Sequence, residues 1–140
     1  MTEQEITRTI EGQRRFFATR KTFDIDYRVA LLKRLRDNIS KYQDDINAAL
    51  KLDIGKSAYE AYMCEVGLVL SDIRLTIRHI RRWSRARRVR THIGNFPSVS
   101  RIIPEPYGTV LIMSPWNYPF LLSLQPLIGA VAAGNTVILK

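Results

Sequence analysis

Apolar side chains recur at helical spacing from the start of the chain and predict an opening helix. Thr2 and Glu5 have the spacing of a capping box, in which each side chain accepts from the other residue's free backbone N–H. The apolar positions that follow share one helical face: Ile6, Ile10 and Phe17. The pattern therefore predicts a first helix from Thr2 to about Arg20.

A second amphipathic segment begins near Asp26, whose carboxylate is a good helix N-cap. Its apolar positions again lie at helical spacing: Val29, Leu32, Leu35 and Ile39. Beyond Tyr42 the pattern fits two alternatives. The second helix could continue with a bend, or a third helix could start at Asp44-Asp45. Gly55 closes this region.

The longest helical signal runs from Ala58 to about Ser84, and one apolar stripe follows it while the arginines stay off the stripe. The stripe comprises Val66, Val69, Leu70, Ile73, Ile77 and Ile80. The period changes after Val89, where residues 92–97 are typical of a loop or an edge strand. Residues 99–103 are rich in β-branched side chains and predict an edge strand that ends at Pro104-Glu105-Pro106.

The last part of the chain predicts a strand, a helix and a second strand. Residues 109–113 form a nearly continuous apolar run, typical of a strand buried on both faces of a parallel sheet, and Ser114-Pro115 ends it. An apolar helix is expected from Tyr118 to about Ala133, with a kink or a helix start near Pro126 and a stop at Gly134-Asn135. Residues 136–139 then form the second strand, which makes a right-handed βαβ unit. The predicted fold class is α/β.

Both strands of this unit end in polar residues that could face a ligand. In parallel sheets, ligands bind beyond the carboxyl ends of the strands, and residues 114–117 and Lys140 occupy those positions. No G-x-G-x-x-G motif is present, so topology alone leaves a nucleotide site and a purely structural turn both open. Gly55-Lys56-Ser57 ends like a phosphate-binding loop, but the first glycine and the preceding strand of that motif are missing, and we reject it.

Composition and charge narrow the class of protein. A chain of 140 residues with 46% apolar content can bury one modest core. The net charge of +9 comes largely from eight arginines between Arg74 and Arg90, a pattern typical of a solvated face or a subunit contact.

A single cysteine, Cys64, excludes an internal disulfide, and neither it nor the two histidines suggest a metal site. With no signal peptide and no apolar run of membrane-spanning length, we expect a cytoplasmic protein; an anchor beyond Lys140 is not assessable.

Two segments then carry a resemblance. Residues 101–120, RIIPEPYGTVLIMSPWNYPF, and residues 129–140, GAVAAGNTVILK, resemble the aldehyde dehydrogenase superfamily, and within it the class 3 and fatty-aldehyde branch. Weaker similarity extends back through residues 55–57, 60–62, 65–73 and 83–84. The resemblance implies that the chain begins with helices, continues with an excursion that contains an edge strand, and ends with the first βαβ unit of a Rossmann-like sheet. Together these elements would form an incomplete aldehyde dehydrogenase fold. The implied segments are 1–85, the helical part of the cofactor domain; 86–106, an oligomerisation-type linker; and 107–140, the truncated start of the NAD(P)-binding domain.

The resemblance also implies roles for individual residues. Asn117 corresponds to the asparagine whose amide donates to the developing oxyanion, although a helix N-cap is an equal alternative. Lys140 corresponds to the lysine that contacts the adenosine ribose. Tyr118 would line the aldehyde tunnel or simply pack. The implied cofactor-binding residues are Met113, Ser114, Pro115, Trp116, Asn117 and Lys140; without the family, Trp116 would be predicted to lie in the core.

The implied activity is the oxidation of an aldehyde to a carboxylic acid with NAD or NADP, through a thiohemiacetal formed on a cysteine. Cys64 lies upstream of the Pro-Trp-Asn block, whereas the family's nucleophile lies far downstream. We therefore expect the nucleophile and the base to lie outside this chain, and these residues alone to have no activity. The complete enzyme is expected to be a homodimer with no nucleic-acid partner. The alternatives are a truncated non-catalytic subunit and a basic module that binds nucleic acid or anionic lipid.

Overall fold

The computed structural model describes residues 2–140. Its first helix begins with a capping box. The Thr2 N–H donates to Glu5 Oε2 at 2.8 Å and the Glu5 N–H donates to Thr2 Oγ1 at 3.3 Å, so the predicted capping box is confirmed. The helices are α1 (Glu3–Ala18), α2 (Ile25–Lys41), α3 (Gln43–Ile54), α4 (Ala58–Ala61), α5 (Gly67–Trp83) and α6 (Pro119–Ala133). The strands are β1 (Arg87–Arg88), β2 (Arg101–Ile102), β3 (Thr109–Ile112) and β4 (Thr136–Leu139).

The start of α2 differs from the prediction. Asp24, not Asp26, is the N-cap, and its Oδ1 accepts from the Asp26 N–H at 2.9 Å. Asp26 lies in the first turn of α2, and its carboxylate pairs with Arg81 on α5. Beyond α2, Tyr42 separates α2 from α3, so the continuation is a third helix; Gly55 ends it in the left-handed conformation with φ 72°.

The predicted long helix is continuous but contains a π-helical turn. The segment η2 (Tyr62–Val66) joins α4 to α5, and the Gly67 N–H donates to the Tyr62 carbonyl oxygen five residues earlier. The predicted apolar stripe packs inward: Val66, Val69 and Ile73 are fully buried. The core forms where α2, α5 and α6 pack together, around the buried residues Leu32, Ile39, Val66, Val69, Leu70, Ile73, Ile80, Ile128 and Ala132.

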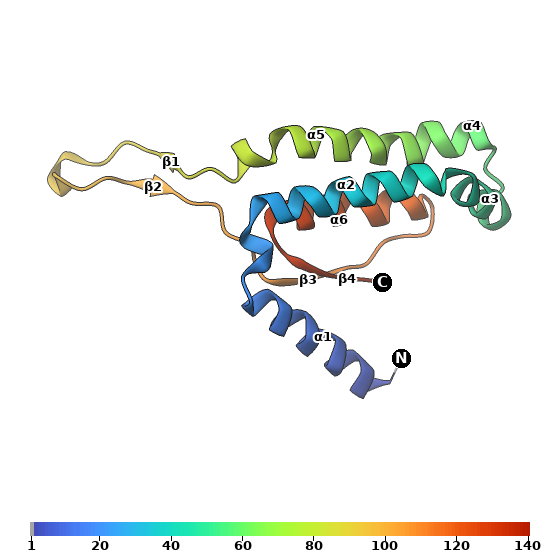
Figure 1. Ribbon diagram of the computed structural model, residues 1–140, viewed down its shortest axis with the longest axis horizontal. Helices are drawn as coiled ribbons and strands as arrows, with labels where there is room; N and C mark the ends of the chain where they lie inside the picture. The colour runs from blue at the N-terminus through green and yellow to red at the C-terminus, as the bar shows by residue number, and fades with distance from the viewer. Residues whose placement is uncertain (1) are drawn as a thin grey trace.

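The chain between α5 and β3 forms a long arm. β1 pairs antiparallel with β2, in the register Arg87 to Ile102 and Arg88 to Arg101. Figure 1 shows this hairpin projecting away from the helices. The expected edge strand at residues 99–103 is therefore confirmed only at its centre, because the ladder is two residues long, and the sequence did not reveal its partner β1.

The βαβ unit forms as predicted. β3 and β4 pair in parallel from Thr109–Thr136 to Ile112–Leu139, and α6 connects them. The sheet lies between α6 and α1, since both helices contact β4 (Figure 1). Pro126 lies inside α6 without ending it. The expectation that both strands are buried on both faces is wrong for residues 2–140: Leu111 is 57% exposed and Leu139 is 45% exposed, because α1 and α6 cover only part of the two-stranded sheet.

Gly134 gives a first prediction. It ends α6 with φ 92°, and a Cβ there would lie 3.0 Å from the Thr22 carbonyl oxygen. We expect Gly134→Ala to lower the free energy of unfolding by about 1–2 kcal/mol, because an L residue strains this backbone conformation. Gly12→Ala in α1 is the control: apart from the adjacent backbone of α1, a Cβ at Gly12 would meet no atom within 4 Å, so this change should raise stability slightly. Urea denaturation that ranks the two variants in the opposite order would contradict the argument.

Candidate functional site

The two strand ends meet through their backbones. The Lys140 N–H donates to the Ile112 carbonyl oxygen at 2.9 Å, and the Ser114 N–H donates to the Lys140 carbonyl oxygen at 3.4 Å. The parallel ladder therefore continues one residue beyond each strand. This pairing brings the turn at residues 114–117 next to Lys140 at the carboxyl edge of the sheet, which is where ligands bind in α/β proteins.

The turn is tied to α6 by two serines. Ser114 Oγ and Ser123 Oγ are 2.7 Å apart, and the Ser123 hydroxyl also donates to the Pro119 carbonyl oxygen at 2.5 Å. Because Ser114 follows β3 closely while Ser123 lies on α6, this contact limits how far the intervening loop can move. The residues from Pro115 to Tyr118 therefore connect two fixed points.

Asn117 lies in this loop with an exposed side chain. Within residues 2–140 its side-chain amide makes no hydrogen bond to the protein, and α6 begins at Pro119 with Tyr118 in the N-cap position and no side-chain cap. The alternative interpretation of Asn117 as an N-cap is therefore wrong, because the helix starts two residues further on. Its amide N–H donors are left available to another group.

Trp116 and Met113 do not lie in the core, contrary to what the apolar pattern alone would predict. Trp116 is 86% exposed and Met113 is 72% exposed. An exposed indole offers a flat apolar face and one N–H donor, while the ammonium of Lys140, also exposed, offers mobile donors suited to hydroxyl or phosphate oxygens. The strand ends thus combine apolar surface, amide donors and one cation.

A buried ion pair beneath the loop is the feature that sequence reasoning missed. Lys56 Nζ lies 2.5 Å from Glu65 Oε1, and the side chains are only 8% and 0% exposed. Lys56 Nζ also lies 3.8 Å from the centroid of the Tyr118 ring. The signal was a carboxylate on the apolar stripe, since Glu65 precedes Val69 and Ile73 at four-residue intervals.

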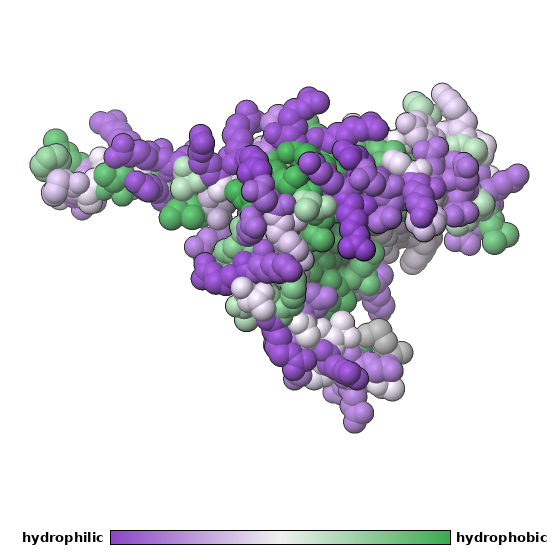
Figure 2. Space-filling view, in the orientation of Figure 1, coloured by the Kyte–Doolittle hydropathy of each residue, from purple (hydrophilic) through white to green (hydrophobic). Residues whose placement is uncertain are grey.

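The remaining polar candidates do not join this site. Cys64 is a free, half-buried thiol within η2. In the described part of the chain no three His, Cys, Asp or Glu side chains are grouped so as to hold a metal ion, and none of its helices is both long and apolar enough to cross a membrane. Hydrophilic side chains cover α5 and much of the arm (Figure 2). The exposed arginines of residues 74–90 lie on these two segments, and Arg81 on α5 pairs with Asp26 on α2.

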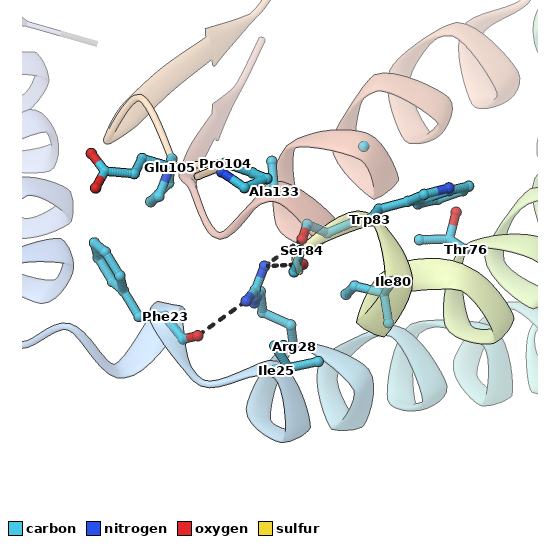
Figure 3. Close-up of a pocket in the computed structure, with 13 residues that line it drawn as sticks. Phe23, Ile25, Arg28, Thr76, Ile80, Trp83, Ser84, Pro104, Glu105 and Ala133 are labelled. Carbon is cyan, nitrogen blue, oxygen red and sulfur yellow. Dashed lines mark hydrogen bonds between the residues drawn. The ribbon is translucent and has the colours of Figure 1, made fainter. Parts of the chain in front are cut away.

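A cavity of about 390 Å³ lies at the opposite, amino edge of the sheet, between Pro104-Glu105-Pro106 and the end of α6. Arg28 reaches into this region (Figure 3). Its guanidinium donates to the Ala132 carbonyl oxygen at 2.7 Å and to the Phe23 carbonyl oxygen at 3.0 Å. Burial lowers the pKa of Arg28 below its ordinary value, while nearby Asp24 acts in the opposite direction. Because its donors are occupied by main-chain carbonyls, Arg28 serves to hold the end of α6.

The sequence of this chain is similar to the sequences of known aldehyde dehydrogenases. A sequence model of the Aldehyde dehydrogenase family matches residues 1–140. The chain is 47% identical over 125 residues to 4,4'-diaponeurosporen-aldehyde dehydrogenase of Staphylococcus aureus, covering 89% of this chain and 27% of that protein. It is 42% identical over 127 residues to aldehyde dehydrogenase family 3 comG of Dictyostelium discoideum, covering 91% of this chain and 27% of that protein. The chain thus spans less than a third of the length of these relatives.

Solved structures show the same fold. The substrate-bound AldH of Staphylococcus aureus superposes with a TM-score of 0.94 at 44% identity, covering 96% of this chain and 30% of that chain. Succinic semialdehyde dehydrogenase from Streptococcus pyogenes, solved with NADP+ as the cofactor, gives a TM-score of 0.87 at 20% identity over 100% of this chain and 30% of that one. The family match over the whole chain, together with these relatives, establishes that the chain belongs to the aldehyde dehydrogenase family.

Proposed function

We propose that residues 1–140 supply the oxyanion donor and one side of the cofactor crevice of an NAD(P)-dependent aldehyde dehydrogenase, which oxidises aldehydes to carboxylic acids. The observation that carries the proposal is the position of Asn117: its amide, which no other residue in 2–140 engages, lies in the loop between Ser114, whose N–H donates to the Lys140 carbonyl oxygen, and Ser123. A helix cap or a core residue at this position would have its polar atoms occupied or buried.

The residues at the strand ends fit a dinucleotide. Lys140 would hold the hydroxyl oxygens of the adenosine ribose, and Trp116 with Met113 would provide apolar surface along the adenosine side. Ser114 and Pro115 complete the lining of the diphosphate side. NAD or NADP, when bound, supplies the acceptor for the hydride that leaves the substrate. The alternating apolar and polar donor groups at this edge support this assignment.

Asn117 would act on the substrate side. When a cysteine thiolate attacks the aldehyde carbon, a C–S bond forms and the π electrons of the C=O bond move onto the oxygen. The adduct is a thiohemiacetal whose oxygen carries the negative charge. The Asn117 amide would donate to that oxygen and stabilise the transition state more than the ground state. Hydrolysis of the later thioester requires a carboxylate base. The nucleophile and this base would come from outside residues 1–140, and Tyr118 would border the aldehyde.

The three segments of the chain would have different roles in the complete enzyme. Residues 1–85 form the helical support of the cofactor domain, residues 86–106 form an arm suited to contact between the subunits of a homodimer, and residues 107–140 begin the cofactor-binding sheet. Support for the arm's role comes from its exposed apolar side chains: Ile93 and Phe96 are each 86% exposed.

Lys140 provides the experiment that tests the cofactor side. In the full-length protein that carries residues 1–140, we expect Lys140→Met to raise the KM for NAD(P) about 10-fold, because a hydrogen bond from a charged donor contributes about 1.5 kcal/mol or more. kcat should change little, since the contact is remote from the reacting atoms. Lys33→Met, at an exposed position on α2, is the control. An unchanged KM for both variants would argue against a cofactor site at this edge.

A further inference from the structure

We infer that Glu65 and Lys56 are positioning residues: their buried ion pair fixes the amino end of α6 and, through it, the direction in which Asn117 presents its amide. The inference rests on the proposed function, in which Asn117 donates to the oxyanion. It concerns two side chains that belong to neither the loop nor the cofactor edge.

Glu65 contacts the amino end of α6. Glu65 Oε2 accepts from the Phe120 N–H at 2.8 Å and from the Leu121 N–H at 3.1 Å. Free N–H groups in the first turn of a helix are normally satisfied by the N-cap side chain, but Tyr118 at that position makes no such bond. Glu65 therefore caps α6 from a different helix, and its negative charge is favourable at a helix amino terminus.

Lys56 is the charge partner of Glu65. Glu65 is fully buried, so its charge requires a partner. Lys56 Nζ supplies one at 2.5 Å from Oε1 and leaves Oε2 for the two backbone donors. The same ammonium lies over the ring of Tyr118, at 3.8 Å from the centroid. The pair thus holds both the residue after Asn117 and the helix turn that follows it.

A π-helical turn allows Glu65 to face α6. Glu65 lies within the π-helical turn η2, and such turns alter which side a residue faces. The turn requires a small residue at Gly67, because a Cβ there would lie 2.8 Å from the Tyr62 carbonyl oxygen. Gly67 therefore permits the backbone that presents the carboxylate, and this accounts for a glutamate on an otherwise apolar stripe.

Asn117 lies three residues before Phe120 and has no side-chain hydrogen bond of its own within the described residues. Its orientation therefore depends on the loop ends, one held by the serine contact and the other by Glu65. Small displacements of a catalytic group lower rates strongly, about 10²-fold for an error near 1 Å. Loss of the Glu65 contact should therefore act on catalysis through Asn117.

A double-mutant cycle in the full-length enzyme tests this dependence. We expect Glu65→Gln to lower kcat about 10-fold to 100-fold with little change in the KM for NAD(P). In an Asn117→Ala background the same substitution should change kcat by less than about 2-fold, because the donor that it misplaces is already gone. Glu60→Gln, at an exposed carboxylate on α4, is the matched control and should leave kcat unchanged.

Amide hydrogen exchange provides a readout that does not depend on catalysis. Exchange at Phe120 and Leu121 should be faster in Glu65→Gln than in the wild-type enzyme, and unchanged in Glu60→Gln. Should Glu65→Gln fail to fold, Glu65→Asp retains the charge beside Lys56 but withdraws the acceptor from α6, and the same results are expected for it.

The outcomes separate the two proposals. Equal kcat losses in both backgrounds, or unchanged exchange at Phe120 and Leu121, would overturn the positioning role while leaving the proposed function intact. If Asn117→Ala alone left kcat unchanged, the proposed function would fail and the positioning role with it. A non-additive kcat loss together with faster exchange is the result that the positioning role predicts.

Discussion

Replacing Asn117 with alanine is expected to lower kcat of the full-length enzyme about 10²-fold to 10³-fold, the effect of removing one preorganised oxyanion donor. The substitution removes an amide that no other described residue engages and leaves the backbone of the loop after β3 in place. Steady-state kinetics with a simple aldehyde and saturating NAD(P) measures the effect. The KM for the cofactor should change little, because the lost contact is made to the reacting oxygen.

The control for this prediction is Asn38→Ala, at an exposed asparagine on α2. It removes the same side chain at a position that touches neither strand end, so kcat should equal that of the wild-type enzyme. A fall of less than about 3-fold for Asn117→Ala would mean that other donors carry the oxyanion and that the assigned role is wrong.

Replacing Arg28 with methionine is expected to lower the free energy of unfolding by about 3 kcal/mol or more. Arg28 is 6% exposed, and its guanidinium donates to the carbonyl oxygens of Ala132 and Phe23. A hydrogen bond from a charged donor contributes about 1.5–3 kcal/mol, and both carbonyls would lose their partner. Methionine retains much of the apolar stem, so the loss reports mainly on the polar contacts.

The matched control is Arg74→Met, at an exposed position on α5. Its effect on the free energy of unfolding should stay within about 0.5 kcal/mol, as is usual for surface substitutions. Urea denaturation of both variants gives the comparison. Equal stabilities would show that the hydrogen bonds of Arg28 are replaced by water and that α6 does not depend on them.

Local patterns predicted the elements of this fold well. Thr2 and Glu5 form a capping box because that motif depends only on residues three apart, and Gly134 ends α6 because few other residues adopt its positive φ. The N-cap of α2 was misplaced by two residues because Asp24 and Asp26 are equally good caps in isolation. Asp24 is the cap in the fold, where Asp26 pairs instead with Arg81 from a helix far along the chain.

Contacts between distant segments account for what the sequence did not reveal. Glu65 and Lys56 are nine residues apart, and the backbone donors to Glu65, Phe120 and Leu121, lie more than 50 residues further along the chain on α6. The four-residue spacing from Glu65 to Val69 and Ile73 puts this carboxylate on the apolar stripe, but it does not indicate which groups would satisfy its charge. The resemblance supplied the role proposed for Asn117, whereas the structure adds that its amide has no competing partner within residues 2–140.

The most direct test of the central proposal is a comparison of two proteins assayed for aldehyde-dependent formation of NAD(P)H. One is the 140-residue chain alone; the other is a hybrid in which these residues replace the matching segment of the Staphylococcus aureus relative, which is 47% identical. The chain alone should form no NAD(P)H, because the proposed function takes the nucleophile and the base from outside residues 1–140, and the hybrid should be active. Activity from the chain alone, or a folded hybrid that binds NAD(P) but oxidises no aldehyde, would contradict it.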